Sequence, residues 1–326
     1  MDMAVTVRSF AKINLGLTIG AARLDGFHAL ETIYQTVAAH DLITVEAVAG
    51  DRIVIRCQDA RVPCDSTNTC YRMVERALAV LGCRRQVTIT IDKRLPVQGG
   101  LGAGSSNAVA ALFGLERVME EELTPKDRLR VAAEVGSDVP LFLLGGTVLG
   151  VGRGEQVYPL PELPGLACVL VTPNLAVSTP KAFRDWDELL AANGGLTCSR
   201  GSATLNEFSL SSFEWLSHLN ATGVPAIKGG DRAETPLLDL VRAGIENDFE
   251  RVVFPQYPEL RDVKRMLERE GAGYASLSGS GSTMYGLFAS LALAEQAAAK
   301  LTASGLAARA TQTLTRQQYG EQRFAG

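Results

Sequence analysis

Residues 95–111 contain the residue types best suited to binding a phosphate. They read LPVQGGLGAGSSNAVAA, with four glycines followed directly by two serines and an asparagine. Glycines let a backbone adopt positive φ and approach a ligand closely. Free N–H groups at the start of a helix, together with the helix dipole, attract anions. A phosphate is therefore the ligand that we expect at this stretch.

This stretch matches neither of the two common glycine-rich phosphate motifs. No lysine follows Gly104, where the G-x-x-x-x-G-K-[ST] motif requires one. Counted from Gly100 and Gly102, the third glycine of a dinucleotide fingerprint would fall on Ser105. A flexible connection that binds no ligand is the alternative that these residues leave open.

Two charged residues outside this stretch have unusual sequence surroundings. Lys12 lies in an apolar segment that alternates like a strand and shares one face with Asn14. A lysine there either protects a sheet edge or places its own ammonium group over a phosphate or carboxylate. Asp138 lies between an expected helix end at Gly136 and the apolar run 141–144, which we expect to be a buried strand. It either caps a turn or acts as a base or metal ligand.

An aromatic residue and a histidine, Phe27 and His28, follow the turn signal Asp-Gly at 25–26. Tyr34 follows in an apolar context. Such a pair could stack on a base-like ring and hydrogen-bond to it. The alternative is a core aromatic beside a surface histidine, and these residues alone favour that alternative.

The expected elements place the glycine-rich stretch between a strand and a helix. Alternation over 87–91 predicts the strand, and the apolar run from 108 to 119 predicts the helix. A second glycine-serine loop lies at 276–282, so we expect two walls of one anion-binding cleft. Further helices are expected at 70–80, 125–135, from 179 onward, at 259–270 and at 292–301, and further strands at 43–47, 53–55, 168–171 and 284–288.

Composition indicates an ordinary soluble protein of 326 residues, with two domains or one large one. Hydrophobic residues make up 46% and charged residues 21%, and the net charge of −4 excludes a global basic field for nucleic acid. Six cysteines without a C-x-x-C pair, with three histidines, are poor material for zinc. We see no secretion signal and no run of about 18 apolar residues. A cytoplasmic protein without a membrane partner is expected.

Three motifs occur in the order typical of a known family: AKINL at 11–15, the stretch 96–108, and SGSGS at 278–282. Over nearly its whole length the chain resembles the GHMP kinases of small metabolites. Four shorter pieces, at 25–28, 136–140, 152–155 and 247–250, resemble the subfamily that phosphorylates 4-diphosphocytidyl-2-C-methyl-D-erythritol.

The resemblance implies an α+β, two-domain GHMP-kinase-like fold with the active site in the cleft between the domains. The N-terminal ATP-binding domain would span 1–165 and the C-terminal domain 166–326, with the last strand or tail free to return to the N-terminal domain. The implied reaction is ATP-dependent phosphorylation of the substrate's 2-hydroxyl, in non-mevalonate isoprenoid precursor biosynthesis. The implied partner is a cytidyl diphosphate sugar alcohol, bound by a monomer or weak homodimer.

The resemblance also implies roles for individual residues. Asp138 would be the catalytic base and Lys12 its cationic partner. Magnesium is expected on the ATP phosphates without a named protein ligand, because the glycine loop has no acidic residue. The expected ATP-binding residues are Asn68, Pro96, Gly99, Gly100, Leu101, Gly102, Ala103, Gly104, Ser105, Ser106 and Asn107. The expected substrate-binding residues are Asn14, Phe27, His28, Tyr34, Lys93, Thr179 and Phe183.

The chain departs from the family pattern at several places. Gln98 and Ala103 lie in a loop that is usually richer in glycine, and Phe27 replaces a usual tyrosine, which removes a hydroxyl but keeps a stacking face. Residues 193–235 form a long insertion. Two alternatives remain open: another GHMP kinase of the homoserine or mevalonate type, and a catalytically silent nucleotide-binding protein on the same fold.

Overall fold

The strands form two sheets. The computed structural model describes residues 4–192 and 246–325, so the insertion expected at 193–235 lies outside the described residues. One sheet has seven strands in the order β11-β1-β2-β4-β3, with β5 beside β2 and β6 beside β5, and the other has four in the order β10-β7-β9-β8. The strands are β1 Val5–Ala22, β2 His28–Val48, β3 Ile53–Cys57, β4 Gln86–Asp92, β5 Thr147–Gly152, β6 Gln156–Pro159, β7 Ala167–Val171, β8 Tyr274–Leu277, β9 Met284–Phe288, β10 Ala308–Gln312 and β11 Phe324–Ala325.

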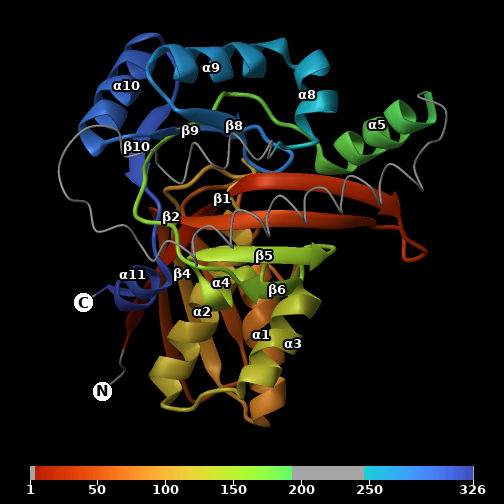
Figure 1. Ribbon diagram of the computed structural model, residues 1–326. Coiled ribbons are helices and arrows are strands. Elements are labelled where there is room, and N and C mark those ends of the chain that lie inside the picture. The colour runs from red at the N-terminus through yellow and green to blue at the C-terminus, as the bar shows by residue number, and fades with distance from the viewer. Residues whose placement is uncertain (1–3, 193–245, 326) are drawn as a thin grey trace.

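Helices cover the outer side of each sheet. Figure 1 shows the β1–β2 hairpin across the middle of the molecule, with α1–α3 on one side of it and α8–α10 and the four-stranded sheet on the other. The described helices are α1 Thr69–Leu81, α2 Ala103–Met119, α3 Pro125–Val135, α4 Leu141–Leu144, α5 Thr179–Ala192, α8 Glu250–Gln256, α9 Pro258–Arg269, α10 Leu291–Ala303 and α11 Arg316–Glu321.

The β1–β2 hairpin belongs to both halves of the molecule. One core packs α1–α3 on the seven-stranded sheet, and another packs α5 and α8–α10 on the four-stranded sheet. A third core joins the two sheets, with Ile13 and Ile33 of the hairpin against Leu170 and Leu287. Apolar cores pack on both sides of the hairpin and exclude water from it. The middle of β1 is therefore buried on both faces. A polar side chain placed there is therefore held in a dry, fixed environment.

The C-terminal segment returns to the first strand of the chain. In β11, Phe324 pairs with Val7 of β1. In α11, the Tyr319 hydroxyl donates a hydrogen bond of 2.6 Å to the carbonyl of Phe142 in α4. The division into two domains near residue 165 stays a proposal.

The expected strand at 141–144 is wrong: these residues form the single helical turn α4. Periodicity cannot separate a strand from a buried helical turn in so short an apolar run. Pro140 already has helical dihedrals, and Gly145 with φ +67° closes the turn by an N–H bond to the carbonyl of Leu141. Asp138 is consequently in the connection between two helices, α3 and α4.

Other expected elements agree with the structure. The strand at 87–91 and the helix from 108 are β4 and α2, and α3 begins after Thr124 and ends before Gly136 as expected. The strand expected at 43–47 is the end of the much longer β2. Among the described helices, none combines the length and apolarity needed to cross a bilayer.

Candidate active site

The buried lysine of β1 faces the carboxylate of the α3–α4 connection. Lys12 is 2% exposed, and its Nζ lies 3.7 Å from Oδ2 of Asp138, whose side chain is 36% exposed. This separation exceeds a good hydrogen bond but keeps the two charges in close contact. Burial lowers the pKa of Lys12 from its ordinary value, and the Asp138 carboxylate acts in the opposite direction. Because its side chain is buried, Lys12 does not protect an exposed sheet edge.

The nearest partner of the Lys12 ammonium is the amide of Asn14, at 2.6 Å from Nζ to Oδ1. The Asn14 amide is oriented in turn by Thr32, whose fully buried hydroxyl accepts from Nδ2 at 2.8 Å and donates to the Gly16 carbonyl at 2.6 Å. Because that hydroxyl proton is committed to Gly16, Thr32 can only accept from Asn14. The chain of bonds therefore points the Asn14 oxygen at Lys12.

Tyr34 holds the other oxygen of the carboxylate. Its hydroxyl donates to Oδ1 of Asp138 at 2.9 Å, and burial raises the pKa of Tyr34 well above its ordinary value, with Asp138 contributing. The phenol thus stays a protonated donor at neutral pH. Tyr34 was expected beside the substrate, and it lines the same cavity as Asp138, but its hydroxyl is bound to the carboxylate.

The two glycine-serine loops contact each other directly. The Ser278 hydroxyl donates to the Gly100 carbonyl at 2.9 Å, and the Thr283 N–H donates to the Gly99 carbonyl at 3.1 Å. The first loop is also tied to β1, since the Lys12 N–H donates to the Leu101 carbonyl at 3.0 Å. Gly102, with φ +66°, starts α2 without a side-chain cap, which leaves the helix N-terminus open to an anion.

Two cavities meet at this loop. One, of about 360 Å³, is lined by the glycine loop and by the start of α1. The other, of about 600 Å³, is lined by Lys12, Asp138 and the hairpin end of β1–β2. Gly100 and Gly102 line both. The charged pair therefore lies in the second cavity, beside the loop that separates it from the first.

The expected ATP-binding residues gather around the smaller cavity. Pro96, Asn68, Asn107 and residues 99–105 line it, whereas Ser106 is buried in α2 and does not. Asn68 caps α1 through an acceptor bond from the Cys70 N–H at 2.8 Å, and Asn107 accepts from the Ser9 hydroxyl at 2.6 Å. The polar atoms of both asparagines are therefore partly committed inside the protein.

Lys93 is placed differently from the expectation. It was expected at the substrate, but it lines the smaller cavity and its Nζ lies 2.5 Å from Oδ2 of Asp41. Asp41 is fully buried and also accepts the N–H groups of Arg94 and Leu95, at 2.7 Å each. This cluster anchors the start of the glycine loop to β2.

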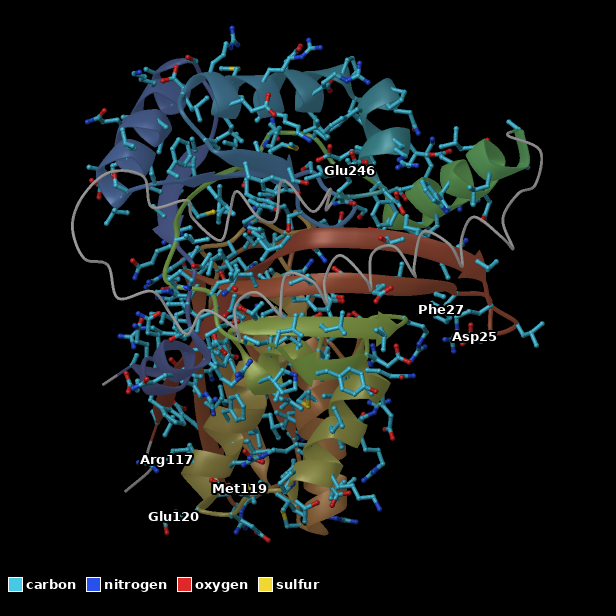
Figure 2. The ribbon with its side chains drawn as sticks, viewed as in Figure 1. Asp25, Phe27, Arg117, Met119, Glu120 and Glu246 are labelled. Carbon is cyan, nitrogen blue, oxygen red and sulfur yellow. The ribbon has the colours of Figure 1, made fainter. Side chains whose placement is uncertain are left out.

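The remaining expected substrate residues line the larger cavity. His28 and Phe183 stack with ring centroids 4.8 Å apart at an angle of 11°, and the Thr179 hydroxyl lies 2.6 Å from that of Ser280. The favoured alternative of a core aromatic beside a surface histidine is wrong, because His28 is 9% exposed and Phe27 is 48% exposed. Figure 2 shows Phe27 near Asp25, at the end of the hairpin.

Comparison with known proteins matches two segments of the chain to one family and aligns most of the chain with a curated relative. Residues 68–146 match the family described as GHMP kinases N terminal domain, and residues 233–307 match GHMP kinases C terminal. A protein of Solibacter usitatus named 4-diphosphocytidyl-2-C-methyl-D-erythritol kinase is 36% identical over 283 residues, which cover 86% of this chain and 80% of that protein. The chain belongs to the GHMP kinase family.

Solved structures agree with this GHMP kinase in fold. A crystal structure of a 4-(cytidine 5'-diphospho)-2C-methyl-D-erythritol kinase superposes with a TM-score of 0.69 at 28% identity, covering 94% of this chain and 98% of the other. A homoserine kinase from Cytophaga hutchinsonii has a TM-score of 0.70 at 21% identity, with 98% and 97% covered. The second likeness establishes the fold alone.

Some residues of this GHMP kinase site carry no local signal in the sequence. Arg153 places its guanidinium 4.8 Å from the Phe27 ring centroid, and Arg184 and Asp187 also line the larger cavity. Arg153 belongs to the piece at 152–155 that carries the family resemblance, but nothing in that piece indicates a contact with Phe27. The missing information is the approach of α5 to the hairpin end, where Phe183 and Asp187 contact His28, and it exists only in the fold.

Gly100→Ala is expected to lower the free energy of unfolding of this GHMP kinase by about 2–4 kcal/mol. The φ of Gly100 is +76°, and an added Cβ would lie 2.1 Å from the Ser278 carbonyl oxygen. Gly104→Ala is the matched control, because its Cβ would meet nothing closer than the Thr69 hydroxyl at 3.7 Å. Chemical denaturation of both variants measures the difference, and equal midpoints would contradict the expectation.

Thr32→Val is expected to lower kcat about tenfold while the protein remains folded. The substitution leaves the Asn14 Nδ2 without its acceptor, so the amide can rotate and withdraw its oxygen from Lys12. Thr32→Ser keeps the hydroxyl and should retain most of the rate. Steady-state kinetics on both variants test this, and a valine variant as fast as the serine variant would remove Thr32 from the site.

Proposed function

We propose that the chain transfers the γ-phosphoryl group of ATP to the 2-hydroxyl of 4-diphosphocytidyl-2-C-methyl-D-erythritol. This is a step of non-mevalonate isoprenoid precursor biosynthesis, and the names of the similar proteins support it. The observation that carries the proposal is the position of the Lys12–Asp138 pair. It lies in the larger cavity, beside glycines that also line the smaller one.

The smaller cavity is proposed to hold ATP, with its phosphates on residues 99–107. The open N-terminus of α2 supports this assignment, because N–H groups and the helix dipole stabilise negative charge there. Pro96 and Asn68 line the same cavity, and in this proposal they would face the nucleoside. The acceptor alcohol would occupy the larger cavity, with Asn14, Phe27, His28, Tyr34, Thr179 and Phe183 around it.

In this proposal Asp138 accepts the proton of the acceptor hydroxyl as the oxygen attacks the γ-phosphorus. Phosphoryl transfer depends mostly on alignment and charge stabilisation, so the contribution of the carboxylate is to orient the alcohol and take its proton late in the reaction. Tyr34 fixes one carboxylate oxygen and leaves the other beside Lys12. The ammonium, held by Asn14, stabilises charge that develops on the phosphoryl oxygens.

Magnesium would accompany ATP and neutralise phosphate charge during transfer. Within residues 4–192 and 246–325, no group of three or more His, Cys, Asp or Glu is placed to hold a metal ion, and the glycine loop has no acidic residue. This scarcity of acidic ligands around the loop suits a metal that is carried on the ATP phosphates with few protein ligands. We also propose that the protein is cytoplasmic and that it is a monomer or weak homodimer. Gel filtration would check the oligomeric state.

A coupled ADP assay tests the proposed reaction. Purified protein is mixed with ATP, magnesium and the cytidyl substrate, and separately with homoserine or mevalonate. ADP release with the cytidyl substrate alone supports the proposal. Turnover only with homoserine or mevalonate would assign the chain to another GHMP kinase activity, and ATP binding without turnover on any acceptor would make it a silent nucleotide-binding protein.

A further inference from the structure

We propose that Asn247 is a positioning residue for the transfer step: its side-chain amide holds the Gly279 peptide in place beside the Lys12 ammonium. The inference rests on the proposed function and adds to it a residue outside both substrate sites. Asn247 begins the piece 247–250, which serves in the sequence only as a sign of family resemblance. It lines neither of the two cavities that meet at the glycine loop, so it acts on the reaction only through what it holds.

Every hydrogen-bonding group of the Asn247 side chain has a partner. The amide nitrogen donates to the carbonyls of Leu277 and Gly279, at 2.8 Å each, and the amide oxygen accepts the Phe249 N–H at 3.0 Å. Among side chains of this length, only asparagine combines two N–H donors with an acceptor. Because the residue is 2% exposed, water cannot readily replace bonds that are lost. The amide therefore joins the start of α8 to the second glycine-serine loop.

The peptide that Asn247 holds lies directly against the catalytic pair. A Cβ added at Gly279 would lie 3.4 Å from Nζ of Lys12 and 3.5 Å from Oδ1 of Asn14. Gly279 also lines the larger cavity, and the preceding residue binds the glycine loop through the Ser278 hydroxyl. One short segment thus sets the distance between the ammonium and the loop proposed to hold the phosphates. Since transfer depends on alignment, a displacement of about 1 Å there is expected to cost up to about 10²-fold in rate.

The neighbouring residue Asp248 makes a buried bond of similar kind to a different part of the molecule. Its Oδ2 accepts the Ile19 N–H at 2.9 Å, and it is 5% exposed. Ile19 belongs to β1 but lines neither cavity. Asn247 and Asp248 are therefore adjacent, buried and hydrogen-bonded alike, and they differ in which segment they hold. This difference separates a positioning role from a contribution to stability alone.

Steady-state kinetics on Asn247→Ser test the proposal. A serine hydroxyl can still accept the N–H two residues further along the chain, but it lacks the two amide donors. We expect kcat to fall about 10–100-fold, with KM for ATP and for the cytidyl substrate within about threefold of the wild type. Asp248→Ala is the matched control and should keep kcat within about threefold, even if its melting temperature falls as far. A wild-type kcat in Asn247→Ser, or an equal loss of kcat in Asp248→Ala, would overturn the proposal.

Hydrogen exchange measures the position of the loop without any substrate. In the loop, the Ser278 N–H donates to the Thr283 carbonyl, and the Thr283 N–H donates to the Gly99 carbonyl. Both amides should exchange about tenfold faster in Asn247→Ser than in the wild type, whereas Asp248→Ala should change these two by less than about twofold. Unchanged exchange of the two amides in a folded Asn247→Ser would overturn the proposal.

Asn247→Asp is the second variant and replaces the serine variant in both experiments if that protein does not fold. The substitution keeps the shape of the side chain and the acceptor for the Phe249 N–H, but a carboxylate has no proton to donate to the two carbonyls. The same loss of kcat and the same faster exchange are expected, and their absence would count equally against Asn247. If the wild type shows no kinase activity while the loop amides respond as expected, the proposed reaction is wrong and the anchoring by Asn247 stands.

Discussion

Asp138→Asn is expected to lower kcat by about 10³-fold while the enzyme stays folded and still binds both substrates. Asparagine has nearly the same shape as aspartate, and its side-chain oxygen can still accept the Tyr34 hydroxyl. It cannot take up the proton of the acceptor alcohol, and it offers the Lys12 ammonium no opposite charge. The loss should therefore fall on the chemical step.

The measurement is steady-state kinetics with both substrates varied, combined with a thermal melt. KM values within about threefold of the wild type and an unchanged melting temperature would confine the effect to transfer. Asp262→Asn is a suitable control, because Asp262 is an exposed carboxylate on α9 that pairs with Arg265 at 3.8 Å. Near-normal turnover in Asp138→Asn would exclude the carboxylate as the base.

The glycine loop is the part of the site that local sequence describes best. Alternation over 87–91 predicts β4, and the apolar run after the loop predicts α2, because periodicity reflects burial on one side of an element. Gly100 and Gly102 have the positive φ that a tight loop against a ligand requires. The sequence predicts that this loop and the second glycine-serine loop form two walls of one cleft. In the structure the two loops also hydrogen-bond to each other directly, through residues 278–283 of the second loop.

The rest of the site depends on information that no local pattern contains. The length of the β1–β2 hairpin sets the register that places Thr32 and Tyr34 beside Asn14. The approach of α5 to the hairpin end brings Asp187 to His28. The sequence around Lys12 and around Asp138 is compatible with a structural and a functional role for each. Only the family resemblance predicts that the two side chains lie together.

Lys12→Met is expected to lower kcat by about 10²–10³-fold, and to change how stability depends on pH. Methionine fills a similar volume but removes the ammonium that Asn14 and Asp138 face. Burial lowers the pKa of Lys12 below 10.5 in the folded protein, so the folded state binds the proton less tightly than the unfolded state. For the same reason, the alkaline loss of wild-type activity should begin below pH 10.5.

The sign of the stability effect follows from proton linkage. Between the folded pKa of Lys12 and 10.5, the unfolded chain binds more protons at this site than the folded one, so the free energy of unfolding rises with pH there. Methionine does not titrate and lacks this contribution. The wild type should therefore gain stability relative to Lys12→Met as the pH increases through that window, measured by urea denaturation at a series of pH values. Lys126→Met, at an exposed site on α3, should retain activity, and a Lys12→Met difference that falls with pH would mean that the ammonium is stabilised, not strained, by its burial.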